Sequence, residues 1–282
     1  MDKAVVIGTY EFLGFSLCEN LLEKGYQVKG IHIDLEEEDL FLEEKRMEVG
    51  RNANFIELSL EDWKQQNFME SDSVLIISVY DYFIKNKIQS LLKDEQFWNT
   101  ILPRIVKSEI LILWPIQLLA KNKEEVREED GSDELHEFFG KFTHPSLTSI
   151  FVPTLFGPWQ PPEFIFQKTF LHRLGNNEQP VLNKREWVFD AIYIEDCVNK
   201  IIDIFEKKRN KCCYLRNTVN DSWLKCAISL AIETKGAREN GKEDLIIDSK
   251  IPAESVEESV ELLDGIKKQK DHLERILSLK NM

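Results

Sequence analysis

The first thirty residues contain the feature that most constrains how this 282-residue chain can fold. Residues 4–7 form a short, wholly apolar run, typical of a strand buried on both faces of a parallel sheet. Gly8 ends that run, and from Gly14 onward apolar residues recur at helical spacing. Gly25 then stands where a helix commonly ends in a left-handed cap. A second strand is expected over residues 27–33, so the segment predicts a β-α-β unit.

The glycine turn of this unit has a recognisable spacing. Gly8 and Gly14, with Phe12 and Leu13 before the second glycine, resemble the G-x-x-G-x-x-G turn of the extended short-chain dehydrogenases, the NAD-dependent epimerase/dehydratase family. In that pattern the glycines permit a tight turn and let the backbone approach a pyrophosphate. Glu11 stands where the family has its middle glycine.

The resemblance returns later in the chain. Residues 149–159, SIFVPTLFGPW, resemble the family's sixth strand and its Tyr-Gly-Pro turn, and residues 187–196, WVFDAIYIED, resemble its later strand leading into a helix. We expect Asp196 to cap a helix over 197–207. Thr154 stands where many members have a substrate-contacting asparagine, and Phe189 where many have a phosphate-binding arginine.

The fold implied by the resemblance is α/β, a Rossmann-like doubly wound parallel sheet with a small C-terminal α+β subdomain. The expected main domain covers residues 1–160 and is completed by about 187–207, leaving 161–186 and 208–282 to the subdomain. Further strands are expected over 54–60, 73–79, 109–113, 211–217 and 245–247. Helices are expected over 40–49, 96–107, 163–174 and 223–235, with a largely helical tail over 255–280.

Cofactor contacts also follow from the resemblance. Asp34 lies about 20 residues beyond Gly14, where a carboxylate binds the adenosine ribose in this fold, and the acidic residues after it disfavour NADP. Those acids could equally serve only to favour the start of the next helix. The cofactor expected from the resemblance is NAD, bound weakly or not at all. Ser59 stands where the family has an aspartate that contacts the adenine. The full set of implied dinucleotide contacts is Gly8, Thr9, Glu11, Phe12, Leu13, Gly14, Asp34, Ser59 and Ser78.

The residues expected to carry catalysis are missing. The family's tyrosine, in a Tyr-x-x-x-Lys pair, acts as general acid and base because the lysine lowers its pKa. This chain has no tyrosine between Tyr82 and Tyr193, and residues 114–117, WPIQ, offer no hydroxyl for the substrate. Lys141, His144 and Tyr193 are the candidates for replacement acid and base groups, although Lys141 and His144 could be surface residues without a chemical role.

Two functional hypotheses remain. The first is a non-catalytic member of the family that serves as a binding or regulatory protein, because the departures concentrate where the chemistry would be. The second is an active NAD-dependent oxidoreductase or epimerase that acts on a nucleotide sugar through other residues. Under the first hypothesis, Glu11 accepts the amide hydrogens at the helix start or occupies the phosphate position. The alternative for this residue is that Glu11 points to solvent and NAD still binds through Gly8, Gly14 and Asp34.

Composition narrows the class of partner. A net charge of −14 disfavours nucleic acid and anionic membranes, and no apolar run has membrane-spanning length. We therefore expect a cytoplasmic protein whose partner is a small molecule or another protein. The charged segment 120–145 replaces a long family helix that contributes to dimer contacts, which predicts a monomer or an atypical dimer.

The five cysteines include no C-x-x-C pair, so we expect no metal site and interpret the cysteines as small buried apolar residues. Cys212 and Cys213 should point to opposite faces of a strand.

Overall fold

A computed structural model describes residues 2–33, 39–65, 73–92, 98, 109–120, 146–176, 178–208, 211–234, 247 and 250–280. The chain divides into two compact units. Unit 1 comprises Met1–Trp114, Gly131–Ile150 and Ile204–Cys212, and unit 2 comprises Pro115–Asp130, Phe151–Asp203 and Cys213–Met282.

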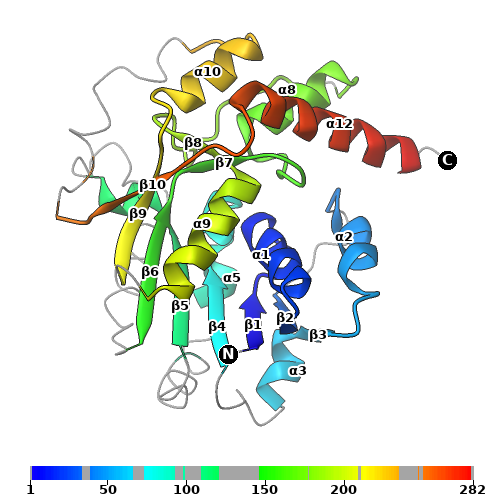
Figure 1. Cartoon of the computed structure of the whole chain (residues 1–282). Coiled ribbons are helices and arrows are strands. Elements are labelled where there is room, and N and C mark those ends of the chain that lie inside the picture. The colour runs from blue at the N-terminus through cyan, green and yellow to red at the C-terminus, as the bar shows by residue number, and fades with distance from the viewer. Residues whose placement is uncertain are drawn as a thin grey trace. The chain divides into compact units, whose positions relative to one another are not determined.

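Unit 1 is built on a parallel sheet (Figure 1). Its strands follow the order β6-β5-β4-β1-β2-β3. Their bounds are β1 (Lys3–Ile7), β2 (Gln27–His32), β3 (Phe55–Ser59), β4 (Ser73–Ser78), β5 (Glu109–Pro115) and β6 (Leu147–Val152). β1 pairs in parallel with both β2 and β4. The strand order therefore reverses beside β1, and in such sheets ligands bind outside the carboxyl ends of the strands at this point.

Helices of unit 1 connect these strands. They are α1 (Phe12–Glu23), α2 (Leu42–Val49), α3 (Leu60–Gln65), α4 (Val79–Ile84) and α5 (Ile88–Leu92). α1 packs on β1, β2 and β4 and buries the predicted stripe that includes Leu17, Cys18 and Leu21. Gly25 has φ +83°, so the expected left-handed conformation after the helix is confirmed. Every residue of β4 is buried, which places the core of unit 1 around its central strands.

Unit 2 holds most of the remaining elements. These are the 3-10 turn η2 (Ile116–Leu119), β7 (Thr154–Phe156), α8 (Ile165–Arg173), β8 (Ala191–Tyr193), most of α9 (Ile194–Glu206), nearly all of β9 (Cys212–Asn217), α10 (Ser222–Ser229), β10 (Ala253–Val256) and α12 (Leu262–Lys280). β7 pairs in parallel with β8, and β9 with β10.

A buried amide network anchors α12 within unit 2. The Gln269 Oε1 accepts the Gly157 N–H at 3.0 Å. Its Nε2 donates to the side-chain oxygens of Gln160 and Gln167, at 2.6 and 2.8 Å. All three glutamines are at most 1% exposed. Because buried polar groups are costly unless paired, this network specifies the position of α12 within the unit.

Several expectations about unit 2 are corrected. α9 begins at Ile194, three residues earlier than predicted, so Asp196 lies in its first turn and does not cap it. The Asp196 carboxylate instead accepts the Ser259 N–H. The chain over 253–256 is the strand β10, and the terminal helix begins only at Leu262. A four-residue strand with one buried residue has no periodicity long enough to predict.

Other expectations concern the cysteines and the segments outside the described residues. Cys212 is exposed and Cys213 is buried, which confirms their opposite orientation. The helix predicted over 96–107 and most of the strand predicted over 245–247 lie outside the described residues. Within the described part of the chain, none of the helices combines the length and apolarity needed to cross a bilayer.

Candidate functional site

The turn between β1 and α1 has the close geometry that its two glycines predict. Gly8 has φ +87°, a conformation that side chains other than glycine rarely adopt. A Cβ added to Gly14 would lie 2.1 Å from the Gly8 carbonyl oxygen, so the helix and the strand end approach as only glycine allows. The turn therefore presents the amino end of α1 at the carboxyl edge of the sheet.

A carboxylate of the chain itself occupies the amino end of α1. Asp81, in the first turn of α4, accepts the Leu13 N–H through Oδ1 and the Gly14 N–H through Oδ2, both at 3.0 Å. The Ser78 hydroxyl donates to Asp81 Oδ2 at 2.6 Å. Amides at a helix start are the groups that receive a pyrophosphate in dinucleotide-binding turns. Here two of them are already satisfied internally.

The charge of Asp81 is held at a cost. Its side chain is only 3% exposed. Burial, reinforced by the nearby charge of Glu11, raises the pKa of Asp81 to about 6 despite the three hydrogen bonds that favour the carboxylate. The group is therefore ionised at neutral pH and loses its charge on mild acidification.

Glu11 does not make the first of the two contacts predicted for it, the hydrogen bonds to the helix amides. It is the N-cap residue of α1, but its side chain makes no capping hydrogen bond, and its Oε2 lies 2.8 Å from the Lys85 Nζ. Lys85 also lies 3.0 Å from Asp39 Oδ2. The expectation that Glu11 accepts the helix amides is thus wrong, because Lys85 attracts its carboxylate while Asp81 takes those amides.

Burial alone would raise the pKa of Asp39. Lys85 and Lys45 outweigh that effect and hold the pKa of Asp39 below its ordinary value.

A second lysine, Lys45, is buried beside the turn between β1 and α1. Lys45 is 2% exposed, and its Nζ donates to the Tyr10 carbonyl oxygen at 2.7 Å. The rings of Phe15 and Phe41 lie 5.5 and 5.9 Å from that nitrogen. Burial lowers the pKa of Lys45, although the charge of Asp39 acts in the opposite direction. We refer to Glu11, Asp39, Lys45, Asp81 and Lys85 together as the carboxylate–lysine cluster.

Three further predicted contacts, Ser59, Thr9 and Phe12, lie in the described part of the chain, and Ser59 is paired within it. Ser59 ends β3, where its hydroxyl donates to Asp62 Oδ2 at 2.6 Å and accepts the Asp62 N–H at 3.0 Å. Thr9 is fully buried. Phe12 is buried in α1. Asp34, Lys141 and His144 lie outside the described residues.

Tyr193 lacks the environment of a catalytic tyrosine. Its hydroxyl donates to Glu195 Oε1 at 2.9 Å, and its ring is buried. Burial and the charge of Glu195 raise the pKa of Tyr193, whereas the resemblance requires a lowered pKa. The geometry gives no support to Tyr193 as a general acid and base.

In unit 2, the two residues that stand where the family contacts its substrate, Thr154 and Phe189, both contact Trp187. The Thr154 hydroxyl donates to the Trp187 carbonyl oxygen at 2.8 Å, and the Phe189 ring packs against Trp187 with centroids 5.0 Å apart. Glu186 accepts the Ile165 N–H at the start of α8, at 2.9 Å. Burial raises the pKa of Glu186 to about 7.

Sequence reasoning missed Asp81, Lys85, Lys45 and Asp39. A signal for Asp81 existed, because it follows the apolar run of β4 by three residues, and the carboxyl end of such a run adjoins the ligand site of this fold. Among the residues that the structure describes, no three His, Cys, Asp or Glu side chains come together as metal ligands would.

Comparisons with known proteins identify the fold. One similar structure is the crystal structure of UDP-glucuronic acid 4-epimerase from Bacillus cereus in complex with UDP-glucuronic acid and NAD. It superposes on this chain with a TM-score of 0.65 and 16% sequence identity, and the match covers 97% of this chain and 99% of the epimerase chain. The dTDP-glucose 4,6-dehydratase from Bacillus anthracis str. Ames, in complex with NAD, gives a TM-score of 0.59 at 11% identity, over 98% and 97%.

This chain has the fold of the NAD-dependent epimerases and dehydratases. The expected Rossmann-like α/β class is confirmed, and so is the resemblance at the level of the fold. No protein-family model matches the chain. A curated relative, the uncharacterized protein YjaV of Bacillus subtilis (strain 168), is 28% identical over 162 residues, which cover 54% of this chain and 83% of YjaV.

Proposed function

We propose that this chain is a non-catalytic protein with the epimerase/dehydratase fold, which acts by binding or regulation and whose dinucleotide site is closed at neutral pH. The observation that carries the proposal is the Asp81 carboxylate, 3.0 Å from two amide nitrogens at the start of α1. Those amides are where a pyrophosphate would bind.

Opening the site has a calculable cost. A diphosphate would have to displace Asp81 from two charge-assisted hydrogen bonds, each contributing about 1.5–3 kcal/mol. It would also approach three carboxylates of the carboxylate–lysine cluster, which has only two lysines. The missing tyrosine between Tyr82 and Tyr193 removes the proton donor even if a dinucleotide enters.

The alternative is an active NAD-dependent oxidoreductase or epimerase. One observation favours it: the close approach of Gly14 to the Gly8 carbonyl is the turn that admits a pyrophosphate, and this chain retains it. In that case Asp81 would leave the amides when NAD binds.

Calorimetric titration of NAD at pH 8 tests the proposal. We expect weak or undetectable binding by the wild type and a gain of at least roughly tenfold for Asp81→Ala, since about 1.4 kcal/mol corresponds to a factor of ten. Glu11→Gly alone should produce little gain, because Asp81 still occupies the amides. Asp271→Ala, which removes an exposed carboxylate on α12, is the matched control.

Two outcomes would contradict the proposal. One is equal NAD affinity in the wild type and in Asp81→Ala, with circular dichroism showing both to be folded. The other is steady formation of NADH by the wild type with nucleotide sugars, abolished by Lys141→Ala.

A further inference from the structure

The Asp81 carboxylate is placed so that its protonation changes the start of α1. It accepts the Leu13 N–H through one oxygen and the Gly14 N–H through the other, each at 3.0 Å. An ionised carboxylate offers both oxygens as acceptors, whereas a neutral one carries a hydroxyl that donates. The Ser78 hydroxyl oxygen, 2.6 Å from Asp81 Oδ2, is the acceptor for that donor once the serine hydroxyl turns. A neutral Asp81 therefore gives up one of the two amides.

The charged groups around Asp81 act in the same direction. Glu11 is the nearby charge that opposes ionisation of Asp81, and Lys45 on α2, whose pKa burial lowers, is also within reach of the Asp81 charge. Lys85, the residue that follows α4, pairs with Glu11 at 2.8 Å and with Asp39 at 3.0 Å. The carboxylate–lysine cluster holds one more carboxylate than lysines, and a proton on Asp81 removes that excess. A diphosphate then meets less repulsion.

His32, the last residue of β2, is a second group near this edge of the sheet that titrates in mild acid. Burial lowers its pKa, and its Nε2 lies 3.7 Å from Glu57 Oε1. Its ring centroid lies 6.3 Å from that of Tyr10. Because these contacts do not involve the Asp81 carboxylate, a substitution at His32 separates its titration from that of Asp81.

We propose that Asp81 is a proton-operated gate: protonation of its carboxylate opens the start of α1 to the diphosphate of a dinucleotide, and binding of the dinucleotide takes up that proton from solvent. This inference rests on the proposed function, because it concerns the site that Asp81 closes. The two effects form one reciprocal coupling, since a proton that favours the ligand is favoured by the ligand to the same extent.

The titration of Asp81 sets the size of the coupling. Burial and the charge of Glu11 raise its pKa to about 6, so about half of the chains hold a neutral Asp81 at pH 6 and about one in a hundred does so at pH 8. The apparent affinity of a ligand scales with the fraction of chains competent to bind it. The affinity for NAD should therefore rise by up to roughly fiftyfold from pH 8 to pH 6. The diphosphate of NAD is a diester that does not titrate in this range, so the change belongs to the protein.

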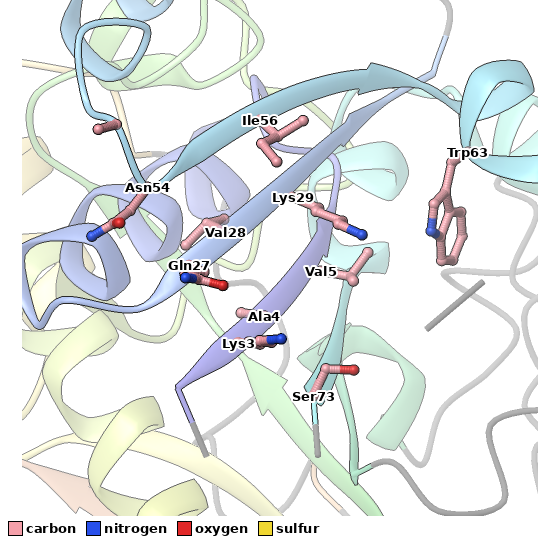
Figure 2. A pocket seen from close by; sticks show the side chains of 11 residues that line it. Lys3, Ala4, Val5, Gln27, Val28, Lys29, Asn54, Ile56, Trp63 and Ser73 are labelled. Atoms are coloured by element: carbon pink, nitrogen blue, oxygen red, sulfur yellow. The ribbon is translucent and has the colours of Figure 1, made fainter. Parts of the chain in front are cut away.

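A cavity of about 190 Å³ lies at the opposite edge of the sheet in unit 1 (Figure 2). Its lining includes Lys3, Val28 and Ser73, at the amino ends of their strands, whereas Asp81 follows the carboxyl end of β4. A ligand held in this cavity should bind independently of the charge of Asp81. The pH response of a variant with a neutral residue at position 81 therefore distinguishes the gate from binding elsewhere in the unit.

Calorimetric titration of NAD into the full chain at pH 8, 7 and 6 tests the gate. For the wild type we expect affinity to rise at least roughly tenfold from pH 8 to pH 6. Buffers of different ionisation enthalpy should show uptake of about half a proton per NAD at pH 6. Asp81→Asn, which keeps the shape of a neutral carboxyl group, should bind NAD at pH 8 about as the wild type does at pH 6, and it should take up no proton.

Two variants serve as controls. His32→Gln should keep the pH response of the wild type. Asp271→Asn, which removes an exposed carboxylate on α12, should do the same. Circular dichroism checks that each protein is folded at each pH.

The outcomes separate this inference from the proposed function. If Asp81→Ala gains affinity at both pH 8 and pH 6 while the wild type binds equally weakly at both, Asp81 closes the site without responding to protons, and the gate is overturned alone. The gate is also overturned if Asp81→Asn retains the pH response or if His32→Gln removes it. If Asp81→Ala shows no gain at pH 8, the proposed function is contradicted and the gate with it.

Discussion

Replacing Asp81 with asparagine should change how the free energy of unfolding depends on pH. In the folded chain the pKa of Asp81 is raised to about 6, first by burial and then by the charge of Glu11, whereas an aspartate in an unfolded chain titrates near about 3.9. Between these values the folded state retains a proton that the unfolded state has lost. The stabilisation from a neutral Asp81 is therefore complete below about pH 4 and is lost as the pH rises through about 6.

The size of the effect follows from this difference. The difference between these pKa values corresponds to roughly 3 kcal/mol in total, of which roughly half falls between pH 5 and pH 8. Asparagine keeps the shape of the side chain but cannot ionise. Its amide leaves one helix N–H without an acceptor, at a cost that is the same at both pH values. We expect the stability of Asp81→Asn relative to the wild type to increase by roughly 1–2 kcal/mol from pH 5 to pH 8.

Urea denaturation at the two pH values, followed by circular dichroism, measures this change. Asp271→Asn, at an exposed position on α12, controls for the removal of one negative charge. If Asp81→Asn and the wild type lose or gain stability in parallel, the Asp81 carboxylate is not held at a cost, and the electrostatic account of the closed site fails.

Three further predictions concern the turn, the amide network and catalysis. Gly14→Ala would place its Cβ 2.1 Å from the Gly8 carbonyl oxygen. Thermal denaturation should therefore show that the free energy of unfolding falls by roughly 1–3 kcal/mol or more. A change below about 0.5 kcal/mol, the usual range for an ordinary surface site, would contradict the geometry. Gln269→Leu removes the acceptor of the Gly157 N–H and should cost roughly 1–3 kcal/mol for that group alone, whereas Lys270→Leu, its exposed neighbour, should cost little. Purified protein incubated with NAD and a panel of nucleotide sugars should form no NADH in a spectrophotometric assay and no altered sugar by chromatography, because an epimerase re-oxidises its NADH within each turnover. Steady conversion of a nucleotide sugar would refute the non-catalytic proposal.

The sequence alone determined the features that depend on local geometry. The apolar run of β1, the glycines at positions 8 and 14 and the left-handed Gly25 are steric requirements within one β-α-β unit, so they could be read from neighbouring residues. The same holds for the opposite orientation of Cys212 and Cys213, which follows from the two-residue period of a strand.

Tertiary structure alone decided which side chain fills the amino end of α1. Asp81 lies 68 and 67 positions from the amides it binds, and Lys85 pairs with Asp39 across 46 positions. Proximity in sequence favoured Glu11, but the crossing of the chain from β3 to β4 places Asp81 in line with those amides and Lys85 beside Glu11. Charges act through space at a few ångströms, so their partners are determined by the order of the strands and not by the order of the residues.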